Sequence, residues 1–231
     1  PEGDRTNLPL ILAAALFIGL HVGVSGTRLR AIAVARLGEK GFQGAFSLAT
    51  AVALLLLILA WRAAPTTPLW SAPGWLRILL LSAMAPVFVL FVAAVAKRNP
   101  TAVAGGALPA DPQGIQRVTR HPMLWAFSLW AAIHMLGNGD TAALVFFGAF
   151  LVTALAGMPS IDAKIAARDP AAWQPFAAKT SATPFAAILG GRNAWPAFRE
   201  IGWVPPGAGL VAWLGLAHLR PLLFGVPILL R

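Results

Sequence analysis

Two of the four histidines in this 231-residue chain occupy one apolar stretch, His121 within Arg120-His121-Pro122 and His134 further along. Ionisable side chains at membrane depth are costly, and they usually face a functional interior. A neutral imidazole is also a common ligand of metal ions and of haem iron. The histidines are therefore the first candidates for chemistry in this chain.

The elements that must position them are apolar helices, because 58% of the residues are hydrophobic and only 11% are charged. We predict one all-α integral-membrane domain over residues 1–231, a polytopic helical bundle of about six transmembrane helices. The predicted spans are residues 8–25, 45–61, 75–95, 122–136, 141–158 and 206–224. Glu2 and Asp4 flank Arg5, so the first span is expected to be retained and not cleaved as a leader.

Most of the 18 basic residues follow the first, third and fifth predicted spans. The positive-inside rule makes these connections cytoplasmic and puts both chain termini outside. The long connection at 159–202 is predicted to lie on the cytoplasmic surface, with Asp162 and Lys164 in solvent. The net charge of +10 indicates contact with anionic lipid of the bilayer and not with nucleic acid.

Depth along the predicted helices sorts the histidines into two levels. His21 and His121 fall near the cytoplasmic ends of their helices, while His134 and His218 fall toward the outside. Two imidazoles from different helices can bind haem iron from opposite faces. The haem propionates could then meet three nearby arginines, Arg28, Arg30 and Arg120. A hydrogen-bonded contact between helices is the simpler alternative for each histidine.

Several segments resemble the NnrU family: residues 19–30, 119–125, 129–134, 137–140, 180–185 and 218–226. The resemblance implies a bacterial inner-membrane protein linked to nitrite and nitric oxide metabolism. The same superfamily holds the plant 15-cis-ζ-carotene isomerases, which carry haem b. Their motifs are similar to the sequence around His21 and to Arg120-His121-Pro122. The resemblance implies His21 as one iron ligand and His121 or His134 as the other, and the depth argument favours His121.

The predicted function is therefore that of a haem b protein with His21 and His121 on the iron. Its chemistry is isomerisation of a polyene such as 15-cis-ζ-carotene, or a redox- or nitric-oxide-linked role in denitrification with a small apolar or diatomic ligand. Whether the protein is an enzyme stays open, as does its oligomeric state. Met123 departs from the isomerase pattern, and the chain has no cysteine to match one associated with the isomerase haem site.

Two other classes remain. Arg-His-Pro also occurs in membrane methyltransferases that bind S-adenosylmethionine, although Met123 and Ala126 depart from their pattern and their paired Glu-Glu is missing. A non-enzymatic sensor or an assembly partner of a respiratory complex is the third class. Two motifs have local explanations: Pro122 suits the first turn of a helix, and 138–140 suits a turn in which Asp140 caps the next helix.

Overall fold

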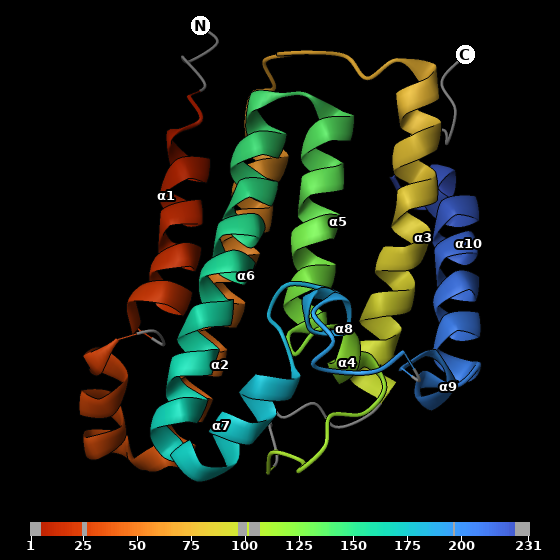
Figure 1. The fold of residues 1–231 in the computed structure, drawn as a ribbon. Coiled ribbons are helices and arrows are strands. Elements are labelled where there is room, and N and C mark those ends of the chain that lie inside the picture. Colours follow the sequence, from red (N-terminus) through yellow and green to blue (C-terminus); the bar gives the residue numbers. More distant parts are fainter. Residues whose placement is uncertain (1–5, 25–26, 97–100, 102–106, 196, 225–231) are drawn as a thin grey trace, which may run out of the picture. The chain divides into compact units, whose positions relative to one another are not determined.

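The computed structural model describes the chain except residues 1–5, 25–26, 97–100, 102–106, 196 and 225–231, and the elements of the described part are all helices (Figure 1). They are α1 (Leu8–Ile18), the π-helix η1 (Gly19–Val24), α2 (Arg28–Ala63), α3 (Gly74–Ala96), α4 (Ile115–Val118), α5 (Pro122–Asn138), α6 (Thr141–Arg168), α7 (Pro170–Lys179), α8 (Ala186–Leu189), α9 (Ala197–Ile201) and α10 (Val204–Phe224). The predicted all-α, membrane-type fold is confirmed.

The described residues of every predicted span are helical, although the first span covers α1 and η1, and those at 45–61 and 141–158 are parts of the longer helices α2 and α6. Three helices are long and apolar enough to cross a membrane, namely α2, α3 and α6, and shorter apolar helices cover Leu8–Val24 and Val204–Leu219. The number of spans stays a prediction. Ser25, the predicted end of the first span, lies outside the described residues, as do both termini and the acidic residues that flank Arg5.

The chain divides into two compact units, and each is described by itself. The first unit comprises Pro1–Ala72 and Ala131–Ser160, and the second comprises Pro73–Trp130 and Ile161–Arg231. Both α5 and α6 contribute residues to each unit. His21 and His134 belong to the first unit, whereas His121 and His218 belong to the second. The organisation as a single domain stays a prediction.

In the first unit α1 lies against α2 (Figure 1), and Leu10 and Leu57 are fully buried. The turn between α5 and α6 has the predicted form, because the Asp140 carboxylate accepts from the Ala143 N–H at 2.8 Å. Gly139 takes φ +65°, and a Cβ there would lie 2.2 Å from the Trp70 carbonyl oxygen. Only glycine therefore fits this turn, which also anchors the connection between α2 and α3.

In the second unit α3 and α10 lie side by side (Figure 1). Their backbones approach closely at Gly209, where an added Cβ would lie 2.6 Å from the Val89 Cα. The Trp213 indole N–H donates to the Leu81 carbonyl at 3.0 Å. Small residues at a crossing let two apolar helices pack without a hydrophobic driving force between them.

The connection predicted at 159–202 begins as helix. α6 continues through Pro159 to Arg168, and α7, α8 and α9 follow. Phe176 of α7 is 1% exposed, and Ile188 of α8 is buried against Val118 of α4. These apolar anchors are thus covered by protein, while the location of the segment on the membrane surface stays a prediction.

Candidate functional site

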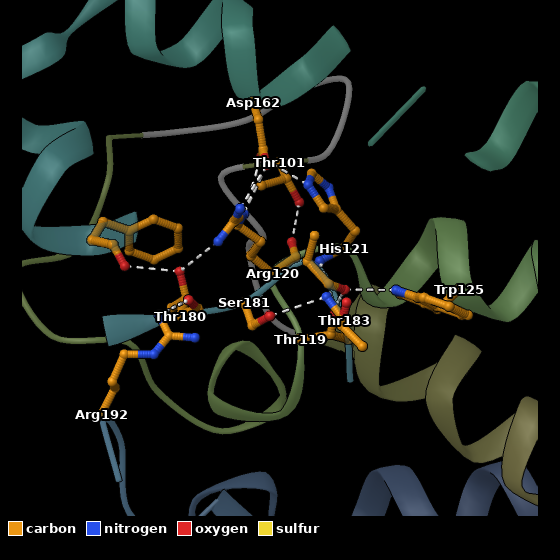
Figure 2. Close-up of polar contacts among 12 residues, drawn as sticks. Thr101, Thr119, Arg120, His121, Trp125, Asp162, Thr180, Ser181, Thr183 and Arg192 are labelled. Atoms are coloured by element: carbon orange, nitrogen blue, oxygen red, sulfur yellow. Dashed lines mark hydrogen bonds and ion pairs between the residues drawn. The ribbon is translucent and has the colours of Figure 1, made fainter. Parts of the chain in front are cut away.

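A buried polar cluster surrounds His121 in the second unit (Figure 2). The His121 ring is 1% exposed, and its Nε2 lies 2.8 Å from Oδ1 of Asp162. Arg120 Nε and a terminal guanidinium nitrogen lie 2.9 and 2.8 Å from Oδ2 of the same carboxylate. Asp162 therefore binds two adjacent residues at the start of α5 at once.

The backbone around His121 is fixed by a second segment of the same unit. Arg120 N–H donates to the Ser181 carbonyl at 3.0 Å. The Thr119 hydroxyl donates to the Ala182 carbonyl at 2.8 Å and accepts from the His121 N–H at 3.2 Å. These contacts satisfy backbone groups that would otherwise be buried without partners before α5 begins at Pro122. The helix start at Pro122 is as predicted.

Arg120 is enclosed by α7 as well as by Asp162. Its guanidinium lies 5.2 Å from the centre of the Trp173 ring, a cation–π distance. A terminal nitrogen lies 3.5 Å from the Thr180 hydroxyl, and Thr180 is itself buried. The structure thus gives Arg120 a carboxylate partner within the protein, and its predicted contact with a haem propionate stays a prediction.

The prediction that Asp162 sits in solvent is wrong. Its side chain is 16% exposed, because α6 does not end at Met158 but carries Asp162 another turn into the second unit. Asp162 is the functional candidate that the sequence analysis missed. A signal was present, since the chain has only 8 acidic residues and a carboxylate near an apolar helix needs a basic partner.

A second, partly buried ion pair in the same unit offers a contrast. Arg117 donates to both carboxylate oxygens of Glu200 at 2.8 and 2.9 Å, and the Gly114 N–H donates to Glu200 as well. The hydrogen bonds that Arg117 donates to Glu200 raise the pKa of its guanidinium. None of these contacts involves a histidine, so this pair joins α4 to α9 without an obvious chemical role.

His21 lies in the first unit, in the π-helical turn η1 that follows α1. Its Nδ1 is 2.8 Å from the Phe17 carbonyl oxygen. Because a carbonyl only accepts, Nδ1 carries a proton, and in the neutral ring Nε2 is the nitrogen with the lone pair. The ring also packs on Phe17 and Phe46, with centres 4.5 and 5.9 Å away. Single π-turns occur often at functional sites.

The other predicted site residues lie apart from these contacts. In the first unit His134 stacks on Phe147 at 4.8 Å, Arg28 is exposed, and Arg30 pairs with Glu39 at 2.5 Å. In the second unit His218 is exposed. The pairings of His21 with His121 and of His134 with His218 stay predictions, because their members belong to different units.

His21 fits a haem iron through its Nε2, whereas His121 would reach an iron only through its buried Nδ1, because its Nε2 is held by Asp162. A metal-binding imidazole normally holds one nitrogen on a carbonyl or carboxylate and offers the other. His21 has this form through Phe17 and His121 through Asp162. His121 Nδ1 is buried and has no hydrogen-bond partner in the described part of the chain. No group of three His, Cys, Asp or Glu that could hold a metal ion occurs among the described residues, whereas haem needs only axial protein ligands.

Comparison with known proteins now identifies the family. The NnrU protein family matches residues 9–228. The chain belongs to the NnrU family. It is 27% identical over 228 residues to a maize protein, and 25% identical over 227 residues to one from Arabidopsis thaliana, each named 15-cis-zeta-carotene isomerase, chloroplastic.

Each alignment covers 95% of this chain, and the chain spans 62% of the maize protein and 61% of the Arabidopsis protein. The relatives are thus longer than the chain described here. No solved structure matches it.

Proposed function

We propose that this NnrU-family protein binds haem b in a lipid bilayer and catalyses cis–trans isomerisation of a polyene, with His21 and His121 as iron ligands. The haem assignment is carried by His21, whose Nδ1 contacts the Phe17 carbonyl and so leaves Nε2 for a ligand. The reaction is supported by the similarity to two 15-cis-zeta-carotene isomerases over 95% of this chain.

Isomerisation conserves every atom of the substrate, so the protein must bind and orient a polyene and need not supply a nucleophile. When bound, haem supplies or withdraws electron density, which lowers the order of a double bond and hence the barrier to rotation about it. The residues of this chain would hold the iron and keep water away. The apolar helices suit a hydrocarbon substrate, because it can reach them directly from the bilayer.

We also infer a bacterial inner-membrane location with both termini on the outer side, on the basis of the basic connections in the sequence. A redox- or nitric-oxide-linked role uses the same haem. It would be favoured by a change in the reduced spectrum on adding nitric oxide together with an absence of isomerase activity.

Absorption spectra of the detergent-purified protein, oxidised and dithionite-reduced, test the haem assignment. We expect a haem b spectrum in the wild type, its loss in His21→Ala and in His121→Ala, and its retention in His134→Ala. His134→Ala is the matched control, since it also removes a half-buried imidazole from an apolar helix. A wild-type protein without a chromophore would overturn the proposal, and loss only in His134→Ala would move the iron to that residue.

The reaction is tested separately in proteoliposomes that contain 15-cis-ζ-carotene, with chromatographic separation of the isomers. We expect conversion by the wild type and none by His121→Ala. Haem-loaded wild-type protein that leaves the isomer ratio unchanged would refute the isomerase activity and keep the haem assignment.

A further inference from the structure

We propose that the first part of α2, residues 28–37, is an interfacial helix that binds anionic phospholipid through Arg28 and Arg36. The segment belongs to the first unit, and its role does not depend on the proposed haem or on the iron ligands. Arg28 would contact a lipid phosphate in place of the haem propionate that the sequence analysis predicted.

The length of α2 places this segment outside the hydrocarbon core of a bilayer. α2 has 36 residues, which is about 54 Å of straight helix at 1.5 Å per residue. A helix that crosses the ~30 Å core needs only about 20 residues. Gly38 has non-helical angles, φ +71° and ψ +165°, and the chain bends there (Figure 1). Because residues 39–63 can cross the core by themselves, residues 28–37 are left at its surface.

The exposed side of residues 28–37 carries both charged and apolar side chains. Arg28, Ile32 and Arg36 follow one another at intervals of four residues and so share one face of the helix. Both arginines are exposed, as are Ile32 at 52% and Leu29 at 55%. Val34, on the other face, is half-buried. Arginines beside exposed aliphatic side chains are typical of a helix that lies in the membrane interface.

The two arginines on this face have no counter-charge within the described part of the protein. Neither Arg28 nor Arg36 forms an ion pair or a side-chain hydrogen bond with a residue that the structure describes. Arg30 of the same segment, in contrast, pairs with Glu39 at 2.5 Å. Glu39 is the sole acidic residue from position 5 to position 110 of the sequence. The charges of Arg28 and Arg36 are thus available to an anion outside the protein.

Phospholipid is the anion that fits this face. A guanidinium can donate two parallel hydrogen bonds to a phosphate, and it stays charged at physiological pH. The aliphatic side chains beside the arginines can enter the boundary between headgroups and acyl chains. A soluble anion would neutralise the charge but leave Leu29 and Ile32 in water, whereas an anionic phospholipid matches both kinds of side chain.

Native mass spectrometry of the full chain in detergent, titrated with phosphatidylglycerol or with phosphatidylcholine, tests the inference. Each basic residue near an anionic lipid surface strengthens binding by about 5-fold. Arg28→Gln/Arg36→Gln should therefore weaken the binding of phosphatidylglycerol by about 25-fold. The binding of zwitterionic phosphatidylcholine should stay that of the wild type.

Arg62→Gln is the matched control, because Arg62 is an exposed arginine in the last turn of the same helix. We expect this variant to bind phosphatidylglycerol as the wild type does. Equal losses in Arg62→Gln and in the double variant would show that net charge, and not the face of residues 28–37, attracts the lipid. That result would overturn the inference, and so would wild-type binding by the double variant.

A second measurement locates the segment in the bilayer. The chain contains no cysteine, so a single introduced cysteine can carry a spin label without background. In vesicles of phosphatidylglycerol and phosphatidylcholine, collisions with oxygen and with a water-soluble nickel complex should place the label of Ile32→Cys about 5–10 Å below the phosphates. The label of Leu48→Cys, in the predicted span at 45–61, should lie deeper. A label at Ile32 in bulk water, or as deep as the one at Leu48, would contradict an interfacial helix.

Haem content distinguishes a lipid phosphate from a haem propionate as the anion at Arg28. We expect the double variant to retain as much haem as the wild type in lipid-free detergent. Loss of haem with unchanged binding of phosphatidylglycerol would overturn the inference and support the predicted propionate contact. A wild type that lacks haem but binds phosphatidylglycerol as expected would refute the proposed function and support the lipid site.

Discussion

His21 and His121 are each held at one ring nitrogen, but the chain holds the two rings by different means. His21 is anchored within its own helix, through the carbonyl of Phe17 four residues earlier. His121 is anchored by the carboxylate of Asp162, which itself pairs with Arg120. The first anchor is neutral and local, whereas the second is charged and comes from another helix.

The difference has consequences for how each ring responds to its surroundings. A backbone carbonyl holds the His21 tautomer but contributes no net charge, and the half-buried ring packs on two phenyl rings. Asp162 provides a negative charge on a side chain that is only 16% exposed. Charges in such surroundings interact more strongly than charges in water. The protonation and charge of the His121 cluster should therefore respond more strongly to nearby substitutions than the surroundings of His21 do.

The largest effect is expected from the arginine next to His121. Arg120→Ala removes one partner of an ion pair whose side chains are 14% and 16% exposed. Breaking a buried pair in this way leaves a charge uncompensated and costs about 3–5 kcal/mol of the free energy of unfolding. Unfolding in mixed detergent–SDS micelles measures this loss.

Arg30→Ala provides the matched control near His21, because Arg30 and Glu39 form a pair whose side chains are 37% and 48% exposed. An exposed pair of this kind contributes about 0–1 kcal/mol. Equal losses in the two variants would show that the charged anchor of His121 is not buried in the bilayer-embedded protein, and the contrast between the two rings would disappear.

A smaller effect is expected from Thr27, which closes the π-turn of His21 onto α2. Its hydroxyl donates to the Gly23 carbonyl at 2.5 Å and accepts from the Leu29 N–H at 3.2 Å as the N-cap of α2. Thr27→Ala should reduce the free energy of unfolding by about 1 kcal/mol. The same unfolding assay measures it.

Thr27→Ser keeps the hydroxyl and should restore nearly all of that stability. Because the His21 ring is fixed by Phe17 and not by Thr27, the haem spectrum of Thr27→Ala should stay that of the wild type. A large spectral change in Thr27→Ala with none in Thr27→Ser would mean that the turn, and not the Phe17 carbonyl, holds His21.

The same contrast explains what sequence analysis could and could not predict. Local rules correctly placed the helix start at Pro122 and the cap at Asp140, and they placed His21 near the end of the first helix. The role of Asp162 was not predicted, because the apolar run ends at Met158 and is followed by Pro159. Proline usually interrupts a helix. The helix continues to Arg168, and only the folded chain shows that Asp162 contacts His121.

The smallest change in stability is expected at the exposed pair formed by Asp111 and Lys179. Its substitution tests whether a surface charge supports the His121 cluster. A hydrogen bond from the Lys179 ammonium lowers the pKa of the Asp111 carboxyl below its ordinary value. Since the folded pKa is the lower one, any stabilisation is fully present above the unfolded pKa of about 3.9 and disappears as the pH falls through the folded value. Asp111→Asn should remove the part of the unfolding free energy that is lost in acid through this pair. It should leave the free energy of unfolding at pH 7 almost unchanged, because exposed pairs are screened by salt.

Lys179 ends α7, the helix whose Trp173 ring covers Arg120. The burial of Phe176 and Thr180 in and after that helix should hold it in place without the surface pair. Unfolding curves and reduced haem spectra of wild type and Asp111→Asn, recorded from pH 7 downward until the protein unfolds, check whether α7 stays in place without the pair. A spectrum that shifts with acid in the wild type but not in Asp111→Asn would show that the surface pair reaches His121 through α7, and the charged anchor would then extend beyond Asp162 and Arg120.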